Sequence, residues 1–187
     1  MEVEDCGLAA EDILLTQDQI ATRLHELAGE IDARYAGDNL LLVGVLGGAF
    51  MIMADLCRNI SMPIEIDWIG AASYGSGTRS SGVVQKTKEL ETNVVGRHVL
   101  LVDDILDTGL TISWLTRLIE SAGAQSVASC VLLRKPGTSA RRIEADFVGF
   151  EIPDVFAVGF GLDHAGQYRN LSCVAQADKA LVRAAAG

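Results

Sequence analysis

The sequence predicts an α/β protein with a mainly parallel twisted sheet flanked by helices, built as a single domain over residues 1–187. Short apolar runs alternate with longer segments of helical periodicity, which is the pattern of parallel strands joined by helices. The most informative run, Val99–Val102, leads into the adjacent carboxylates Asp103 and Asp104. Because ligands of open α/β sheets bind at the carboxyl ends of strands, we expect the site there.

The first elements follow from capping and periodicity. Thr16 and Gln19 match a capping box, and apolar residues from Ile20 onward recur at helical spacing. The continuous apolar run that begins at Leu40 predicts a buried strand, which ends at a glycine pair. The expected elements are a helix over 17–35, a strand over 40–46, a helix over 49–58 and a strand over 63–69.

Residues 72–93 are rich in glycine and polar residues and are too long for an ordinary connection. A mobile functional loop and a plain exposed hairpin explain this segment equally well. The remaining elements are a strand over 99–102, a helix over 111–122, a strand over 127–133, and short strands over 147–150 and 155–160.

Composition limits the function classes. Hydrophobic residues make up 49% of the chain and charged residues 21%, which argues against disorder. The formal net charge of −10 argues against non-specific nucleic-acid binding, although a small anionic substrate needs only local positive groups. No apolar run approaches the roughly 18 residues of a membrane span, and the acidic start does not resemble a secretory signal. The four separated cysteines are expected to be free thiols, so we expect a cytoplasmic protein.

Three predicted strands end in residues suited to a phosphorylated ligand. Glycines follow Leu46, carboxylates follow Val102, and Arg134 with Lys135 follows Leu133. A short Thr/Gly loop that opens a helix can direct several N–H groups at one phosphate. Two adjacent carboxylates suit sugar hydroxyls or Mg²⁺, which takes carboxylates together with phosphate oxygens. The alternative is a solvated acidic turn without a ligand.

The segment 99–111 resembles the phosphoribosyl-pyrophosphate signature of the type I phosphoribosyltransferases, which is an apolar strand, two acidic residues and Thr-Gly-x-Thr. Asp107 occupies the place of the catalytic aspartate of the hypoxanthine-guanine members. Segments 146–154 and 158–163 also resemble this 6-oxopurine branch, and Ser73-Tyr74 resembles the start of its mobile catalytic loop. The resemblance covers residues 40–175 in the same order.

The resemblance implies the type I phosphoribosyltransferase fold, with a core over about 38–150, a small hood from the terminal segments and a mobile loop over about 72–93. It implies Mg²⁺-dependent transfer of a 5-phosphoribosyl group from phosphoribosyl pyrophosphate to N9 of hypoxanthine or guanine. The products are IMP or GMP and pyrophosphate, as in purine salvage. Members of the family are homodimers or homotetramers and need neither nucleic acid nor a membrane.

The resemblance also assigns roles around the ribose. Asp103 and Asp104 face the ribose hydroxyls directly or through Mg²⁺. Asp107 acts as general base near N7 of the purine, a role typically worth about 10²–10⁴-fold in rate. The 5′-phosphate is held by Asp107, Thr108, Gly109, Leu110 and Thr111.

For the base, the resemblance implies that Lys135 donates to the 6-oxo group and that Phe156 stacks on the ring. The backbone of Ala157 and Asp163 contacts the other purine edge, and Asp163 lies near a second Mg²⁺. Read without the family, Phe156 fits a core position and Lys135 a solvated strand end. The implied pyrophosphate-binding residues are Leu46, Gly47, Gly48 and Arg169, and the implied closing residues are Ser73 and Tyr74.

One position departs from the family pattern. Many relatives carry lysine or arginine where this chain has Gly47, so a side-chain charge at the pyrophosphate is missing. The peptide at this place is often cis in the family, which a glycine pair tolerates. The N–H groups of Gly47 and Gly48 remain available to bind pyrophosphate.

Three other functions compete with this interpretation. A two-component receiver also has an Asp-Asp strand end, but near its start, whereas Asp103 lies past the middle of this chain. A non-catalytic regulator on the same fold would bind nucleic acid, which the charge of −10 opposes. A transferase that prefers xanthine differs at the contacts around Asp163, and the sequence does not choose between these bases.

Overall fold

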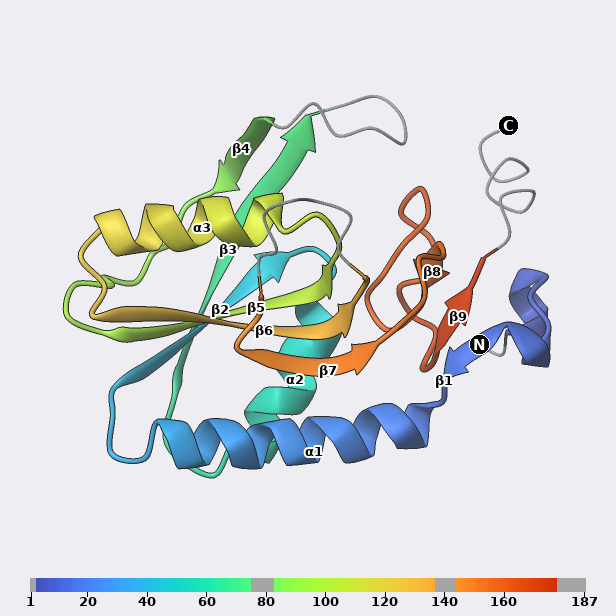
Figure 1. The fold of residues 1–187 in the computed structure, drawn as a ribbon, viewed down its shortest axis with the longest axis horizontal. Coiled ribbons are helices and arrows are strands. Elements are labelled where there is room, and N and C mark those ends of the chain that lie inside the picture. The colour runs from blue at the N-terminus through green and yellow to red at the C-terminus, as the bar shows by residue number, and fades with distance from the viewer. Residues whose placement is uncertain (1–2, 75–82, 137–143, 178–187) are drawn as a thin grey trace.

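The computed structural model describes residues 3–74, 83–136 and 144–177. It contains one six-stranded sheet in the order β4-β3-β2-β5-β6-β7, in which only β4 is antiparallel to its neighbour. Helix α3 covers one face, and α1 and α2 cover the other (Figure 1). The elements are η1 Glu4–Cys6, η2 Ala10–Asp12, β1 Ile13–Leu15, α1 Gln17–Arg34, β2 Leu40–Leu46, α2 Phe50–Asn59, β3 Glu65–Tyr74, β4 Val83–Lys88, β5 His98–Leu106, α3 Leu110–Ser121, β6 Ser126–Arg134, β7 Phe147–Glu151, β8 Ala157–Val158 and β9 Val174–Gln176.

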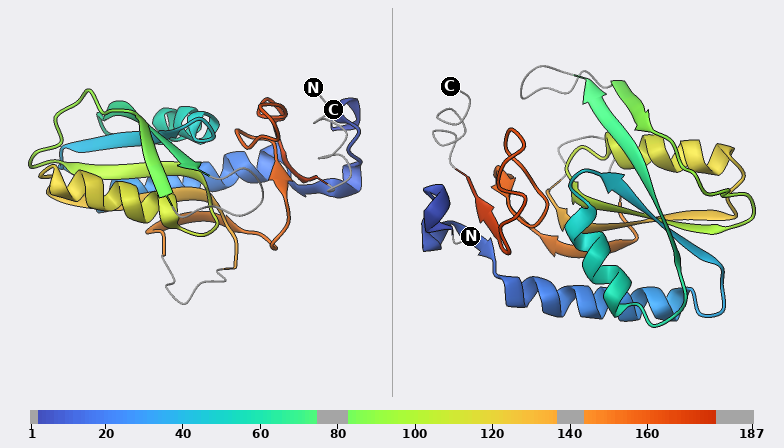
Figure 2. Two further views of the ribbon diagram at one scale, coloured as in Figure 1. Left: turned by 90° about the horizontal axis from the view of Figure 1, so that it is seen from above. Right: turned by 180° about the vertical axis from the view of Figure 1, so that it is seen from behind.

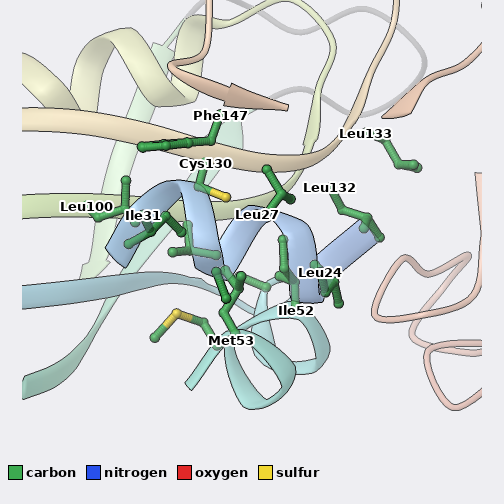
Figure 3. Close-up of a cluster of buried hydrophobic side chains, with 14 of the residues drawn as sticks. Leu24, Leu27, Ile31, Ile52, Met53, Leu100, Cys130, Leu132, Leu133 and Phe147 are labelled. Atoms are coloured by element: carbon green, nitrogen blue, oxygen red, sulfur yellow. The ribbon is translucent and has the colours of Figure 1, made fainter. Parts of the chain in front are cut away.

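The central strands are buried on both faces, which explains their continuous apolar sequence. In β2, Leu40 and Leu42 pack in the cluster with α1 and α2, whereas Leu41 and Val43 pack in the cluster with α3. This alternation is the two-residue period of a strand. Figure 3 shows the larger cluster, in which Leu24 and Leu27 of α1 lie among side chains of α2 and the sheet.

Helix α1 begins as the sequence predicts. The Thr16 hydroxyl accepts from the Gln19 amide at 3.3 Å, and the Gln19 side chain accepts from the Thr16 amide at 2.9 Å. This confirms the capping box, which satisfies two amides that no helical hydrogen bond can use. The buried face of the helix is formed by Ile20, Leu24, Leu27, Ala28 and Ile31.

Strand β5 corrects the predicted end of the central strand. The expected strand stopped at Val102, but β5 continues to Leu106, and Asp103 pairs in register with Val131 of β6. The two carboxylates therefore belong to the strand and do not start a loop. Polar residues persist there because the carboxyl end of this central strand borders a cavity instead of the hydrophobic layers.

Both ends of the 72–93 segment that the structure describes contain strand: β3 ends at Tyr74 and β4 covers Val83–Lys88. Ser73 and Tyr74 end β3 and pair with Val84 and Val83 of β4. The two strands form an antiparallel hairpin with an irregularity between Gly70 and Ala71, so the backbone supports the plain hairpin at its base. The tip of the predicted mobile loop lies outside the described residues.

A second sheet brings distant parts of the chain together. Strands β1, β9 and β8 form it in that order, so residues after η2 pair with residues near position 175. The predicted strand over 155–160 is only two residues long here, because Gly159 and Phe160 turn away with positive φ angles. Figures 1 and 2 show this small sheet at one end of the molecule, and in Figure 1 the arrowheads of β2, β6 and β7 point toward it. Within the described ranges, no helix has the length and apolar character needed to cross a membrane.

Asp67 is a buried carboxylate that fixes the base of the β3–β4 hairpin. It accepts the amides of Trp68, Glu91 and Thr92 at 2.7–2.8 Å and lies 3.7 Å from the Lys88 amine. Burial alone would raise the pKa of Asp67, but these hydrogen bonds outweigh it and hold the pKa below the ordinary value. The carboxylate thereby joins β3 to the segment that precedes β5.

We expect Asp67→Ala to lower the free energy of unfolding by about 3 kcal/mol, because buried amides lose their acceptor. Since the folded-state pKa is depressed, the stabilisation is present above the unfolded pKa and is lost as pH falls through the folded pKa. As pH falls below about 4, the free energy of unfolding measured by urea titration should therefore decrease less in Asp67→Asn than in the wild-type protein. The control is Asp18→Asn, which changes an exposed carboxylate of α1 that is not part of this network. The same loss of stability at acid pH in Asp67→Asn as in the wild-type protein would contradict this role.

Candidate active site

The carboxyl ends of β2 and β5, the start of α3 and the segment before β9 enclose a cavity of about 400 Å³. Its size is in the usual range for a small-molecule site. Of the predicted residues, it brings together the glycine pair, the acidic pair, the Thr/Gly loop, Asp163 and Arg169. The predicted residues that line it are Leu46, Gly47, Gly48, Asp103, Asp104, Asp107, Thr108, Gly109, Leu110, Thr111, Asp163 and Arg169.

Asp103 and Asp104 are two adjacent carboxylates whose pKa values the site raises. Asp103 is 8% exposed, and its carboxylate accepts the Asp104 amide at 2.9 Å. Burial, followed by repulsion from Asp104, raises the pKa of Asp103 well above its ordinary value. Burial also raises the pKa of Asp104, although Arg169 partly opposes this shift. The cavity thus holds two carboxylates that a cation or hydroxyl donors would stabilise.

Gly48 is required by the position of Asp104. A Cβ on Gly48 would lie 1.6 Å from a carboxylate oxygen of Asp104, which is far inside contact distance. A Cβ on Gly161 would lie 2.1 Å from the Gly48 carbonyl oxygen, and Gly161 also has a φ of +100°. The glycine pair after β2 therefore lies between the acidic pair and the segment that carries Asp163. Sequence reasoning missed Gly161, although the repeated glycines at 159 and 161 were a signal for close backbone packing.

The start of α3 presents backbone amides to the cavity. Gly109 adopts a φ of +73° at the N-cap, and the first helical bond runs from the Ser113 amide to the Gly109 carbonyl at 2.9 Å. The amides before Ser113 lie ahead of the helical hydrogen-bond ladder. The Leu110 amide is 3.4 Å from the Thr108 hydroxyl. The helix dipole adds positive potential, so this turn is suited to an anion.

Arg169 is already engaged by protein groups. Its guanidinium donates to the Gly161 carbonyl at 2.6 Å and pairs with Asp163 at 2.7 Å. The same guanidinium carbon would be 3.8 Å from a Cβ on Gly47. The positive charge of Arg169 therefore lies beside Gly47, the position at which many relatives carry a charged side chain. The peptide between Leu46 and Gly47 is cis, as the resemblance implied.

Of the predicted purine-binding residues, Asp163 lines this cavity, whereas Lys135, Phe156 and Ala157 are not among the described residues that line it. The Lys135 amide donates to the Leu106 carbonyl at 3.0 Å, and its amine is 3.5 Å from Asp154. Phe156 is 39% exposed, so its ring is not a core side chain, whereas Ala157 is buried in β8. For the predicted closing residues Ser73 and Tyr74, the structure describes only the backbone, which ends β3.

The three predicted metal ligands do not form one cluster. Among the described residues, no group of three or more His, Cys, Asp or Glu side chains is arranged to hold a metal ion. Asp103 and Asp104 are adjacent on β5, but Asp163 is paired with Arg169 and accepts the Gly166 amide at 2.7 Å. Any metal here would draw its remaining ligands from substrate and water.

Comparison with known proteins identifies the family of the chain. The family model described as "Phosphoribosyl transferase domain" matches residues 11–165. The hypoxanthine-guanine phosphoribosyltransferase of Bacillus subtilis is 44% identical over 161 residues, covering 86% of this chain and 89% of that protein. The Mycobacterium tuberculosis protein of the same name is 42% identical over 174 residues, covering 90% and 86%.

Solved structures of the same family also resemble this chain. A hypoxanthine phosphoribosyltransferase from Staphylococcus aureus superposes with a TM-score of 0.85 at 38% identity, covering 90% of this chain and 92% of that chain. A Trypanosoma cruzi hypoxanthine phosphoribosyl transferase gives 0.87 at 35% identity, covering 95% and 97%. The chain belongs to the phosphoribosyl transferase family. Within that family, these relatives are all from the hypoxanthine and hypoxanthine-guanine group that the sequence resembles. The receiver alternative is thereby excluded.

Proposed function

We propose that the protein is a purine-salvage transferase. It moves the 5-phosphoribosyl group from phosphoribosyl pyrophosphate to N9 of hypoxanthine or guanine and forms IMP or GMP with pyrophosphate. The observation that carries this proposal is the cavity in which an acidic pair, a helix-start amide cradle and an arginine converge. Each of these three parts matches one part of phosphoribosyl pyrophosphate.

The 5′-phosphate fits the turn from Asp107 to Thr111. The backbone amides at the start of α3 and the helix dipole favour a dianion, and Thr108 and Thr111 add hydroxyl donors. The ribose hydroxyls then face Asp103 and Asp104, whose pKa values are raised by burial. Hydrogen bonds from hydroxyls to these carboxylates would offset that cost of burial.

Mg²⁺ fits the acidic pair by its chemistry. Two adjacent carboxylates whose pKa values are raised by burial gain from a divalent cation, and Mg²⁺ accepts few protein ligands together with substrate oxygens. Asp103 and Asp104 would hold it, and Asp163 would stand near a second ion. When bound, the ion would neutralise charge on the diphosphate.

The pyrophosphate would lie against the Leu46–Gly48 loop and Arg169. Gly47 lines the cavity, and Arg169 supplies the cationic charge 3.8 Å from the Cβ position of Gly47. Charge-assisted hydrogen bonds from Arg169 would stabilise the leaving group as negative charge builds on it. For this, Arg169 shares its donors between Asp163, Gly161 and the ligand.

The base would occupy the space next to the Asp107 loop. Asp107 accepts a proton from the purine as the new bond forms, Lys135 donates to the 6-oxo group, and Phe156 stacks on the ring. Adenine cannot accept at that position, so the Lys135 donor would lose its partner. The Ala157 and Asp163 backbones face the other purine edge, and Ser73 and Tyr74 would close over the site.

The decisive test is a spectrophotometric assay of the purified protein with phosphoribosyl pyrophosphate, Mg²⁺ and each of four bases. We expect turnover with hypoxanthine and guanine, less with xanthine, and none with adenine. Preference for xanthine would move the protein to the alternative specificity. No turnover of any 6-oxopurine would reject the proposal, and a salt-dependent RNA mobility shift without turnover would support a nucleic-acid-binding regulator.

The resemblance also leads us to propose a cytoplasmic homodimer or homotetramer. Leu46 at the cavity mouth is 40% exposed and Phe50 at the start of α2 is 38% exposed, so apolar surface is present beside the site. Light scattering of the purified protein would distinguish a monomer, a dimer and a tetramer.

A further inference from the structure

His164 and Phe156 form an aromatic pair beside the cavity. Their ring centroids are 5.5 Å apart, and the ring planes meet at 86°, which is the edge-to-face geometry that aromatic rings favour. Phe156 is 39% exposed, so burial in the core does not fix its ring. The neighbouring ring of His164 is thus a direct restraint on the orientation of Phe156.

The backbone around His164 is itself well fixed. His164 and Gln167 exchange two backbone hydrogen bonds at 3.0 and 3.2 Å and close a four-residue turn. The central residues Ala165 and Gly166 have φ angles of +51° and +81°, which define a tight turn of the primed type. The Gly166 amide also donates to the Asp163 carboxylate at 2.7 Å. The His164 ring therefore projects from a rigid base.

The same turn is joined to the phosphate side of the site. Asp163 immediately precedes His164 and pairs with Arg169 at 2.7 Å, and both line the cavity. The backbone of Phe156 is held separately, because its carbonyl accepts the Ala177 amide at 2.8 Å. A ring on a turn anchored to the Asp163–Arg169 pair thus contacts the ring of the residue that immediately precedes β8 of the small sheet.

We propose that His164 is a positioning residue that holds the Phe156 ring in the orientation in which it stacks on the purine. This inference rests on the proposed function, because it takes Phe156 as the stacking surface. His164 acts through Phe156 and does not touch the base. Its removal should weaken binding of the base and leave the chemical step and the phosphoribosyl pyrophosphate site largely intact.

The test compares His164→Gln, which removes the ring and keeps a polar side chain, with His164→Phe, which keeps a ring. We expect His164→Gln to raise the KM for hypoxanthine about threefold to tenfold, the effect of one aromatic pair. Its kcat and its KM for phosphoribosyl pyrophosphate should stay within about twofold of wild type. His164→Phe should restore the KM for hypoxanthine. The matched control is His25→Ala. The His25 ring lies on α1 and contacts Asn59 at 3.2 Å, so its removal should leave kcat and both KM values unchanged.

Thermal unfolding of each variant separates positioning from folding. Equal loss of activity in His164→Gln and His164→Phe, or an equal rise of both KM values, would overturn the inference and indicate a structural role for the turn. An unchanged KM for hypoxanthine in His164→Gln would also overturn it while the proposed function stands. Wild-type protein that turns over no 6-oxopurine would instead reject the proposed function, and the inference with it.

Discussion

We expect Asp107→Asn to lower kcat by about 10²–10⁴-fold, because asparagine keeps the size of the side chain but cannot accept a proton. Asp107 lies in the cavity lining between the acidic pair on β5 and Gly109 at the start of α3. The phosphate cradle there is built from backbone amides and hydroxyls, which the substitution leaves in place. The KM for phosphoribosyl pyrophosphate should therefore change far less than kcat.

The measurement is steady-state kinetics with hypoxanthine at saturating phosphoribosyl pyrophosphate, together with direct binding of IMP. Asp38→Asn is a suitable control, because Asp38 is 42% exposed and follows α1, away from the cavity. Near-normal kcat in Asp107→Asn would reject Asp107 as the general base. A large rise in KM with unchanged kcat would assign the residue to ground-state binding.

Gly48→Ala should cost about 10²-fold in kcat/KM for phosphoribosyl pyrophosphate, which is the typical effect of misplacing a reacting group by about 1 Å. The added Cβ would fall 1.6 Å from Asp104, so either the carboxylate or the loop after β2 must move. Movement of the loop would also disturb Gly161, which packs against the Gly48 carbonyl. Both outcomes displace groups assigned to ribose and pyrophosphate.

Gly29→Ala in α1 is the matched control, because nothing lies within 4 Å of its Cβ position. It should leave kinetics unchanged and stabilise the helix by about 0.5–1 kcal/mol, since alanine is the better helix former. Activity and unfolding should be measured for both variants. Wild-type kcat/KM in Gly48→Ala would show that the contact between Gly48 and Asp104 does not constrain the site.

Local sequence signals predicted much of the architecture. The capping residues Thr16 and Gln19 located the start of α1, and continuous apolar runs located β2 and β6, because these features depend on neighbours along the chain. The predicted end of this central strand, Val102, was wrong by four residues, because β5 ends at Leu106. Strand pairing with β6 carries Asp103 to Leu106 into the sheet, and no local pattern reports that pairing.

The 72–93 segment shows the same limit. Its glycine and polar content fitted a mobile loop and a plain hairpin equally well. Pairing between β3 and β4 forms a hairpin at its base, and Asp67 fixes that base through amides that come 24 and 25 positions later. The backbone conformation there depends on tertiary hydrogen bonds. Composition alone cannot distinguish a hairpin stabilised in this way from an open loop.

The sequence by itself determined the α/β class, the family resemblance and the identity of the acidic pair and its Thr/Gly loop. These follow because the signature is contiguous from 99 to 111 and its residues are neighbours along the chain. Only the tertiary structure decided that Arg169 lies beside Gly47, that Gly48 gives space to Asp104, and that the rings of His164 and Phe156 meet edge to face. The contacts of Gly47 and Gly48 join segments that are far apart in the chain, and the contact between His164 and Phe156 depends on the turns of the backbone between them, so no local sequence pattern reports these distances.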